Sequence, residues 1–99
     1  MTVRILKLAQ DELDDAVAYY ESEQSGLGER FRFEVHRSLN RIAAFPAAYQ
    51  LVSRRMRRCL VSKFPYGIIY RDGGPGQMIL VVAFSHLHRK PDYWVGRQQ

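Results

Sequence analysis

The sequence is short of features that would place it in a disulfide-rich or membrane class. Cys59 is the single cysteine among 99 residues, so no disulfide can form within the chain. The longest fully apolar run, Met78 to Phe84, has seven residues, whereas a membrane-spanning helix needs roughly 20. The N-terminal stretch MTVRILKLAQDE becomes acidic too early for a signal peptide. We therefore expect one cytoplasmic domain, residues 1–99, that does not bind membranes.

Acidic residues are scarce after the first third of the chain. Residues 35–99 contain eleven basic residues against two acidic ones, a net charge of +9, whereas residues 1–34 carry four basic and eight acidic residues. An excess of this size favours an anionic partner, either nucleic acid or an acidic protein segment. The alternative is ordinary solvated surface charge.

Helical signals dominate the first half of the sequence. A first helix is predicted over residues 9–26 and a second over residues 29–45, separated by the glycines of SGLG and ended by Pro46. We expect acidic residues in the first turns of the first helix, where the helix dipole favours them. The apolar positions at helical spacing are Leu13, Ala16, Val17 and Tyr20 in the first helix and Leu27, Phe31, Val35, Leu39 and Ile42 in the second. The short link predicts an antiparallel helical hairpin.

Strand signals dominate the remainder. The alternating segment VRILK at the N-terminus predicts a strand, and from residue 49 onward four more are expected. These are centred on YQLV, MRRCLVSKF, YGIIYR and QMILVVAF, with DGGPG (residues 72–76) as a turn. The last strand has no polar residue between Met78 and Phe84, which is typical of a central strand covered on both faces. The order βααββββ predicts an α+β fold, an antiparallel-rich sheet with the N-terminal helical hairpin packed on one face.

A dense polar and aromatic cluster follows the last strand. It contains His86, His88, Arg89, Tyr93 and Trp94. If the strand continues, His86 and His88 share one face. Histidines can transfer protons, the arginine can bind phosphate and the aromatic rings can stack on bases, which together would suffice to cleave RNA through its 2′-hydroxyl. The alternative is structural: a histidine bonded to the backbone and aromatic rings that cover a small core. Residues 96–99 are expected to be frayed.

A second candidate surface is the basic segment SRRMRRCLVSK, which contains Arg54, Arg55, Arg57, Arg58 and Lys63. Arginines on both sides of one methionine are typical of a phosphate-binding or acid-binding edge. An edge strand made positive to prevent aggregation would show the same pattern.

Metal binding has little support in the sequence. His86 and His88 combined with Asp92 or Cys59 would be a conceivable ligand set, but the paired spacing of a zinc site is missing. We expect no metal and no other cofactor.

Taken together, the element order, the pattern YYE…GLG…F…L…I…FP, and the segments FPYGIIYR and HLHRKPDYW resemble the RelE/ParE superfamily of bacterial type II toxins. The resemblance covers nearly the whole chain. It implies a small basic toxin of a toxin–antitoxin (plasmid stabilisation) system, neutralised by a cognate antitoxin. That antitoxin is expected to be acidic or partly disordered and to wrap the sheet and helices of the toxin.

The resemblance leaves the target open between two branches. The RelE-like branch cleaves messenger RNA on the ribosome without a metal. For that activity Arg58 matches a basic position of the family, and Arg89 and Tyr93 approximately match two further positions when a small insertion is allowed. Leu60 and Gly67, however, stand where that branch carries basic residues.

In an RNase, His86 or His88 would have to replace the missing acid or base. The ParE-like branch inhibits DNA gyrase by contact, and its last strand often ends in a histidine, two residues, an arginine and a nearby proline, as in HLHRKP. We favour this non-enzymatic branch. The ribosome-dependent endoribonuclease is the alternative, and a non-toxic member that only binds an antitoxin is a third reading.

Overall fold

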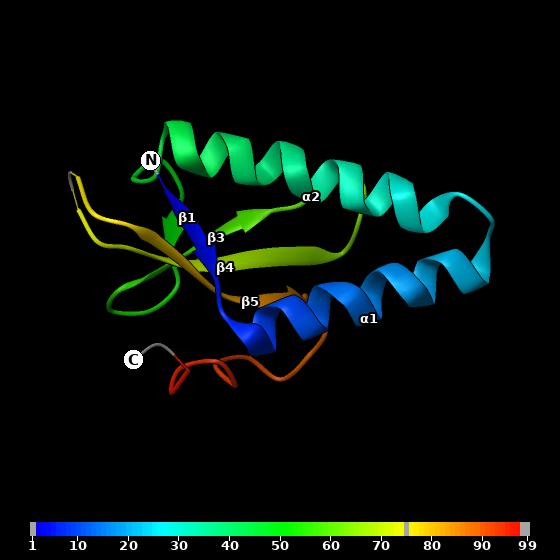
Figure 1. Ribbon diagram of the computed structural model, residues 1–99. Coiled ribbons are helices and arrows are strands. Elements are labelled where there is room, and N and C mark those ends of the chain that lie inside the picture. Colours follow the sequence, from blue (N-terminus) through cyan, green and yellow to red (C-terminus); the bar gives the residue numbers. More distant parts are fainter. Residues whose placement is uncertain (1, 75, 98–99) are drawn as a thin grey trace.

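The computed structural model describes residues 2–74 and 76–97. Two helices follow the first strand and four strands follow the helices (Figure 1). In chain order the elements are β1 (Val3–Ile5), α1 (Lys7–Glu23), α2 (Leu27–Ala44), β2 (Gln50–Leu51), β3 (Met56–Leu60), β4 (Tyr66–Asp72) and β5 (Ile79–His86). The strands form one sheet in the order β1-β5-β4-β3-β2, in which β1 runs parallel to β5 and all other neighbours are antiparallel. The expected α+β fold with the order βααββββ is confirmed.

The helices form the expected antiparallel hairpin against one face of the sheet (Figure 1). The turn between them is held by Glu21, whose carboxylate accepts hydrogen bonds from the backbone N–H groups of Gly26 at 2.9 Å and Gly28 at 3.0 Å. Gly26 has a φ of 86°, a conformation that glycine adopts without steric cost. Helix α2 ends immediately before Phe45 and Pro46, as the proline predicts.

One expectation about α1 is wrong. The helix begins at Lys7, two residues before the predicted start, so its first turn contains no acidic residue. Asp11 instead lies in the second turn, where it pairs with Lys7 at 2.5 Å on the exposed surface. The charge pattern placed the start too late because Leu6, which has an extended conformation, provides no side-chain cap.

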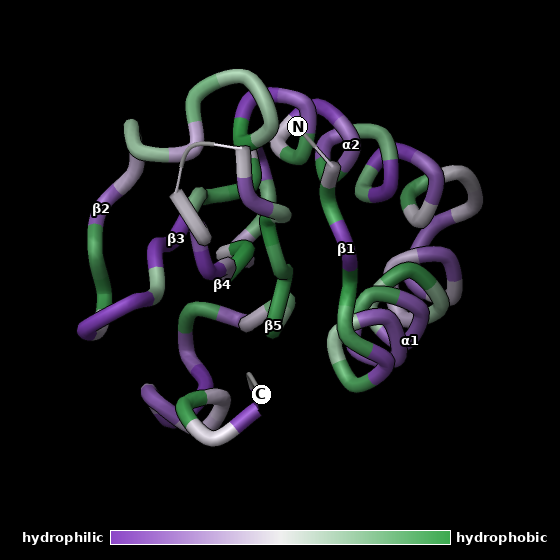
Figure 2. The backbone as a smooth tube through the Cα atoms, turned by 60° about the vertical axis from the view of Figure 1, so that its left-hand side comes forward, coloured by the Kyte–Doolittle hydropathy of each residue, from purple (hydrophilic) through white to green (hydrophobic). Residues whose placement is uncertain are grey.

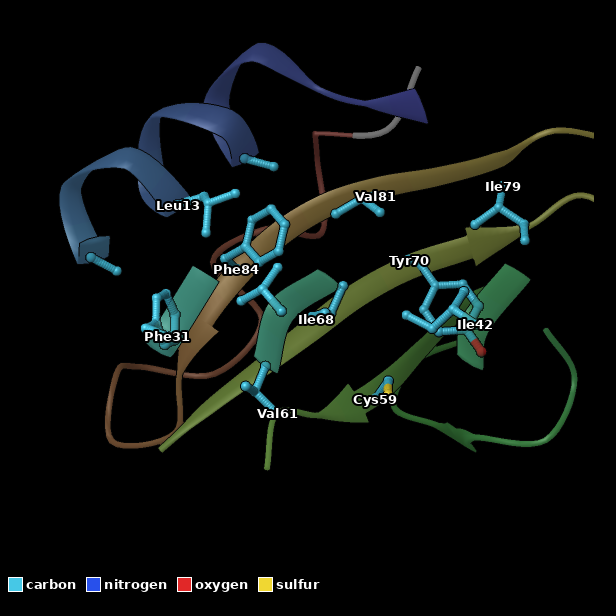
Figure 3. Packing of buried hydrophobic residues seen from close by; sticks show 13 residues of the cluster. Leu13, Phe31, Ile42, Cys59, Val61, Ile68, Tyr70, Ile79, Val81 and Phe84 are labelled. Atoms are coloured by element: carbon cyan, nitrogen blue, oxygen red, sulfur yellow. The ribbon is translucent and has the colours of Figure 1, made fainter. Parts of the chain in front are cut away.

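The main core lies between the helices and the sheet (Figure 3). It is built from the apolar faces of α1 and α2 and from alternate residues of β3, β4 and β5. Aromatic rings of Tyr20, Phe31, Phe64 and Tyr66 pack edge-on or tilted at one end, with centroids 5.0–6.2 Å apart. Tyr70 is fully buried, and its hydroxyl donates to the Pro46 carbonyl at 2.5 Å. Burial raises the pKa of Tyr70 to about 12.

The opposite face of the sheet carries a second, smaller core of Met56, Ile69, Val82, Ala83 and Trp94. A β-bulge makes it possible: Ile69 pairs with Ala83 and Tyr70 pairs with Val81, so both Val82 and Ala83 belong to this core. Strand β5 is therefore covered on both faces, as its apolar sequence predicts. Figure 2 shows that β5 is largely hydrophobic (green), whereas the helices alternate between hydrophobic (green) and hydrophilic (purple) residues.

Three further expectations concern a turn, the sheet edge and membrane-spanning helices. In the turn between β4 and β5, Gly74 and Gly76 have positive φ values of 94° and 74°, while Pro75 lies outside the described residues. The edge-strand interpretation of the basic segment is wrong, because β3 lies between β2 and β4. Within the described residues, neither helix is long and apolar enough to cross a membrane.

Candidate target-binding site

The predicted cluster after β5 is not extended. Strand β5 ends at His86, where the Leu87 N–H donates to the Pro65 carbonyl at 2.9 Å, and the chain then turns. The His88 backbone N–H donates to Nδ1 of His86 at 3.0 Å, and the two rings lie 5.2 Å apart. The expectation that both histidines share one face of an extended strand is therefore wrong, although the turn still brings them together.

His86 is fixed more firmly than His88. Its ring packs edge-on against Tyr66 at 5.1 Å and is half-buried, whereas His88 is exposed. Because Nδ1 of His86 accepts a hydrogen bond, a neutral ring carries its proton on Nε2. His86 can therefore offer one donor, on Nε2, to a bound partner.

An open groove of about 380 Å³ runs beside the turn, between β2 and the C-terminal tail (residues 87–97). Four predicted site residues line it, Arg58, His86, Arg89 and Trp94. Its lining is mixed: apolar side chains come from Leu51, Val52, Ile69, Leu87, Pro91 and Trp94, and the remaining residues are polar, with Asp92 as a carboxylate beside the two arginines. A groove that combines apolar side chains with two arginines suits a macromolecular partner that offers apolar and anionic groups together.

Gly67 determines where the Arg58 side chain lies. A Cβ atom added to Gly67 would come within 2.8 Å of Arg58 Cδ and 2.9 Å of Cγ, so the arginine stem passes directly over the glycine. The missing basic residue at position 67 and the position of Arg58 are thus linked, because a side chain at 67 would displace the arginine. Leu60 pairs with Gly67 across the sheet and is 53% exposed.

Arg89 and Tyr93 are held by a residue that the sequence did not single out, Glu12 of α1. The Tyr93 hydroxyl donates to Glu12 Oε2 at 2.7 Å, and Arg89 Nη1 lies 3.4 Å from the same oxygen. The Arg89 guanidinium also lies over the Tyr93 ring, 3.7 Å from its centroid. Burial, followed by the hydrogen bond to Glu12, raises the pKa of Tyr93, so its hydroxyl stays protonated and donates at neutral pH.

The end of the tail is more ordered than expected. Arg97 donates to Glu12 Oε1 at 2.9 Å and to the Val82 carbonyl at 3.2 Å, and its side chain is 15% exposed. The expected fraying is therefore wrong for Arg97, while residues 98 and 99 lie outside the described residues. Trp94 is 4% exposed, so a base could stack on its indole only if the tail left the sheet.

The predicted basic cluster divides over separate surfaces. Arg54, Arg55 and Arg57 line a hollow of about 400 Å³ together with Arg71, whereas Arg58 lies in the groove beside the tail. Arg57 is partly occupied, since its Nη1 donates to the Tyr49 carbonyl at 2.7 Å.

Lys63 lies on the helix side, with Nζ 3.9 Å from Glu34 Oε2. The structure thus joins Arg58 to the histidine cluster and leaves Arg54, Arg55, Arg57 and Lys63 outside the groove.

The donor groups for a metal do not converge. In residues 2–74 and 76–97, no three His, Cys, Asp or Glu side chains are placed to hold an ion. Cys59 is 1% exposed within the main core, where burial raises the pKa of its thiol. The groove itself offers an imidazole, two guanidinium groups, the Ser85 hydroxyl and the Asp92 carboxylate.

Comparison with known proteins identifies the family. A family model described as the ParE toxin of the type II toxin–antitoxin system parDE matches residues 3–91. A solved structure titled "Chromosomal ParDE TA system from P. aeruginosa" has a similar fold, with a TM-score of 0.62 at 13% identity over 88% of this chain and 96% of that one. None of the curated proteins compared with the chain matches it. The chain belongs to the ParE toxins of type II toxin–antitoxin systems, a family that implies an antitoxin partner.

Proposed function

We propose that this toxin arrests growth by binding DNA gyrase, without catalysing a reaction. The observation that carries the proposal is the engagement of Arg89 and Tyr93 by Glu12. These are two of the three residues on which the resemblance to the RNase branch depends. In an RNase they would have to meet the scissile phosphate, whereas here the Tyr93 hydroxyl donates to the Glu12 carboxylate and Arg89 is ion-paired with the same oxygen.

The neighbouring positions support the same reading. Leu60 and Gly67 leave Arg58 as the one matching cation of the middle strands, and its stem lies flat over Gly67. A groove of mixed polar and apolar side chains that includes two arginines needs only to be complementary to a protein surface. We propose Arg58, Arg89 and the apolar side chains of the groove as the gyrase contact.

A second candidate, cleavage of ribosome-bound messenger RNA, is favoured by the histidine pair. His86 lines the same groove as Arg58 and Arg89, and the ring of His88 lies 5.2 Å away. A proton-transfer group and two cations are therefore within one site. In this reading the histidines replace the acid and base of the RNase branch.

The decisive experiment compares histidine variants in two assays. His86→Gln and His88→Gln keep hydrogen-bonding groups but cannot transfer a proton, and His36→Gln, at an exposed position of α2, is the matched control. Purified proteins are tested for inhibition of gyrase supercoiling, and new RNA 5′ ends are mapped minutes after induction in cells.

Gyrase inhibition that differs little among the four proteins, with no codon-spaced RNA ends, is the result that we expect. Codon-spaced ends that disappear in the His86 or His88 variant, with a rate loss of roughly 10²- to 10⁴-fold, would instead establish the RNase. A wild type that inhibits neither process would leave the third reading, a member that only binds its antitoxin.

We also propose that the antitoxin contributes an acidic segment that covers the basic surfaces of the sheet. Arg54 and Arg55 are exposed and line a hollow in which four arginines face one carboxylate, Asp72, so they suit such a segment. Co-expression with the neighbouring gene product should give a complex that co-purifies at moderate salt. Loss of the partner under those conditions would contradict the proposal.

A further inference from the structure

Glu12 connects three parts of the chain that are distant in sequence. Its carboxylate, whose side chain is 15% exposed, accepts hydrogen bonds from the Phe84 N–H at 3.1 Å, the Tyr93 hydroxyl at 2.7 Å and Arg97 at 2.9 Å. Arg89 completes the set at 3.4 Å. A largely buried carboxylate with four donors from β5 and the tail is a strong and specific anchor, because each bond to a charged group is stronger than a neutral one.

The position of Glu12 follows from the sheet. Strand β1 pairs with β5 only as far as Val81, so no described strand flanks that edge of β5 from Val82 onward. Glu12 takes the backbone N–H of Phe84, and Arg97 takes the carbonyl of Val82. The ion pair between Glu12 and Arg97 thus occupies the place of a missing strand and satisfies backbone groups that would otherwise lie open.

The same anchor sets the position of Arg89. The Arg89 guanidinium rests on the Tyr93 ring at 3.7 Å while its Nη1 faces Glu12, and 53% of its side chain remains exposed beside the groove. Arg97 approaches the Tyr93 ring as well, at 4.9 Å. Glu12 therefore holds the aromatic support on which Arg89 rests, rather than contacting the groove itself.

We propose that Glu12 is the positioning residue for target binding: it docks the tail onto the sheet and orients Arg89 towards the target. This inference rests on the proposed gyrase function. Without the carboxylate, two cations and a tyrosine hydroxyl lose their common acceptor, the tail leaves the sheet, and Arg89 has to be ordered anew at each binding event. Pre-organisation of this kind is lost as affinity.

The test uses Glu12→Gln, which removes the charge with little change of shape. Glu23→Gln makes the same change at an exposed position of α1 and is the matched control. Tyr93→Phe removes one bond to the carboxylate and keeps the ring, so it remains informative if Glu12→Gln folds poorly. Gly28→Ala, which should strain the hairpin far from the tail, is the control for a loss of stability alone.

Three readouts separate positioning from stability. Trp94 is the single tryptophan, so its fluorescence in the folded state reports whether the tail is docked. Far-UV circular dichroism reports the folded fraction, and gyrase inhibition is measured per folded molecule.

We expect Glu12→Gln to weaken inhibition roughly 10- to 100-fold and to expose Trp94. Tyr93→Phe should also weaken inhibition. The variant that combines Glu12→Gln with Tyr93→Phe should lose less inhibition than the sum of the two single losses. Glu23→Gln and Gly28→Ala should match the wild type per folded molecule.

Inhibition by Glu12→Gln and Tyr93→Phe at the wild-type level would overturn the inference, whether Trp94 is exposed or not. A wild type that stops growth but leaves gyrase active would refute the gyrase target alone, and the same comparison of variants is then read from growth arrest. A wild type that affects neither gyrase nor growth would overturn both.

Discussion

Replacement of Trp94 by alanine tests whether the tail is part of the folded core. The indole is 4% exposed and packs with Met56, Ile69, Val82 and Ala83 on the sheet face opposite the helices. Trp94 lies beyond residue 91, where the match to the ParE family ends. The second core is therefore completed by a segment outside the matched residues.

The burial of the Trp94 indole determines how much the free energy of unfolding should fall in Trp94→Ala. A buried tryptophan removes about 150–250 Å² from water, which at about 25 cal/mol per Å² corresponds to about 4–6 kcal/mol. Compactness of the unfolded chain lowers this by about 10–40%. We therefore expect Trp94→Ala to reduce the free energy of unfolding by about 2–5 kcal/mol, which overlaps the range of about 3–5 kcal/mol typical of such truncations.

The loss has an upper bound set by local unfolding. If the tail detaches while the rest of the domain stays folded, the free energy of unfolding falls only by what tail docking contributes. Trypsin distinguishes the two cases, since the bond after Arg89 becomes cleavable when the tail leaves the sheet. Rapid cleavage with a small loss of global stability would identify the tail as a separate unit.

The assay is urea unfolding followed by far-UV circular dichroism, because the variant lacks its fluorescent probe. Val95→Ala is the control, as Val95 is adjacent but 50% exposed, and it should cost less than about 1 kcal/mol. The reasoning is refuted if the two variants unfold within about 1 kcal/mol of each other and resist trypsin equally.

Three further predictions concern the scaffold. Gly28→Ala should destabilise the protein by about 1–3 kcal/mol in urea unfolding, because its Cβ would lie 2.6 Å from the Val17 carbonyl oxygen; unchanged stability would contradict the close approach of the helices. The pKa of Tyr70 is raised from 10.0 to about 12. The protonated hydroxyl therefore adds to the free energy of unfolding in full below pH 10, and this contribution is lost as pH rises through about 12. Tyr70→Phe should remove that loss of stability at alkaline pH and should lower the free energy of unfolding by about 1 kcal/mol at neutral pH. If the stability of the variant fell with rising pH as it does in the wild type, Tyr70 would not be the cause. Gly67→Ala should change stability by less than about 1 kcal/mol because Arg58 is flexible, yet weaken target binding as much as Arg58→Ala does; full activity would show that the position of Arg58 does not matter.

The parts of the fold that were predicted from the sequence rest on local signals. Pro46 ends α2 through its own ring and missing N–H, and the apolar residues at helical spacing define the buried faces of both helices. The run from Met78 to Phe84 predicted a strand covered on both faces. What covers its second face was not predictable, because Trp94 reaches it through a tail without a regular pattern.

The missed site residue shows why the rest was not predictable. Glu12 lies among several acidic residues of an amphipathic helix, where a carboxylate is normally solvated, and its partners are 72 to 85 residues away in sequence. The two histidines were placed on an extended strand because alternation was the only local cue. At the end of β5 the Leu87 N–H donates to the carbonyl of Pro65. Pro65 lies in the connection between β3 and β4, so no local pattern around the histidines indicates this bond.

Part of the charge asymmetry of the chain is neutralised by ion pairs within the protein. Glu12, from the acidic N-terminal third, is the counter-ion of Arg89 and Arg97 in the basic remainder. Arg97 is satisfied by the protein itself, so the positive charge available to a partner is smaller than the net +9 of residues 35–99 suggests. Of the two arginines that line the groove, Arg89 is held in place by Glu12 and the Tyr93 ring. We therefore expect a partner of this toxin to be selected in part by where Arg89 is held, and helix α1 holds it there through Glu12.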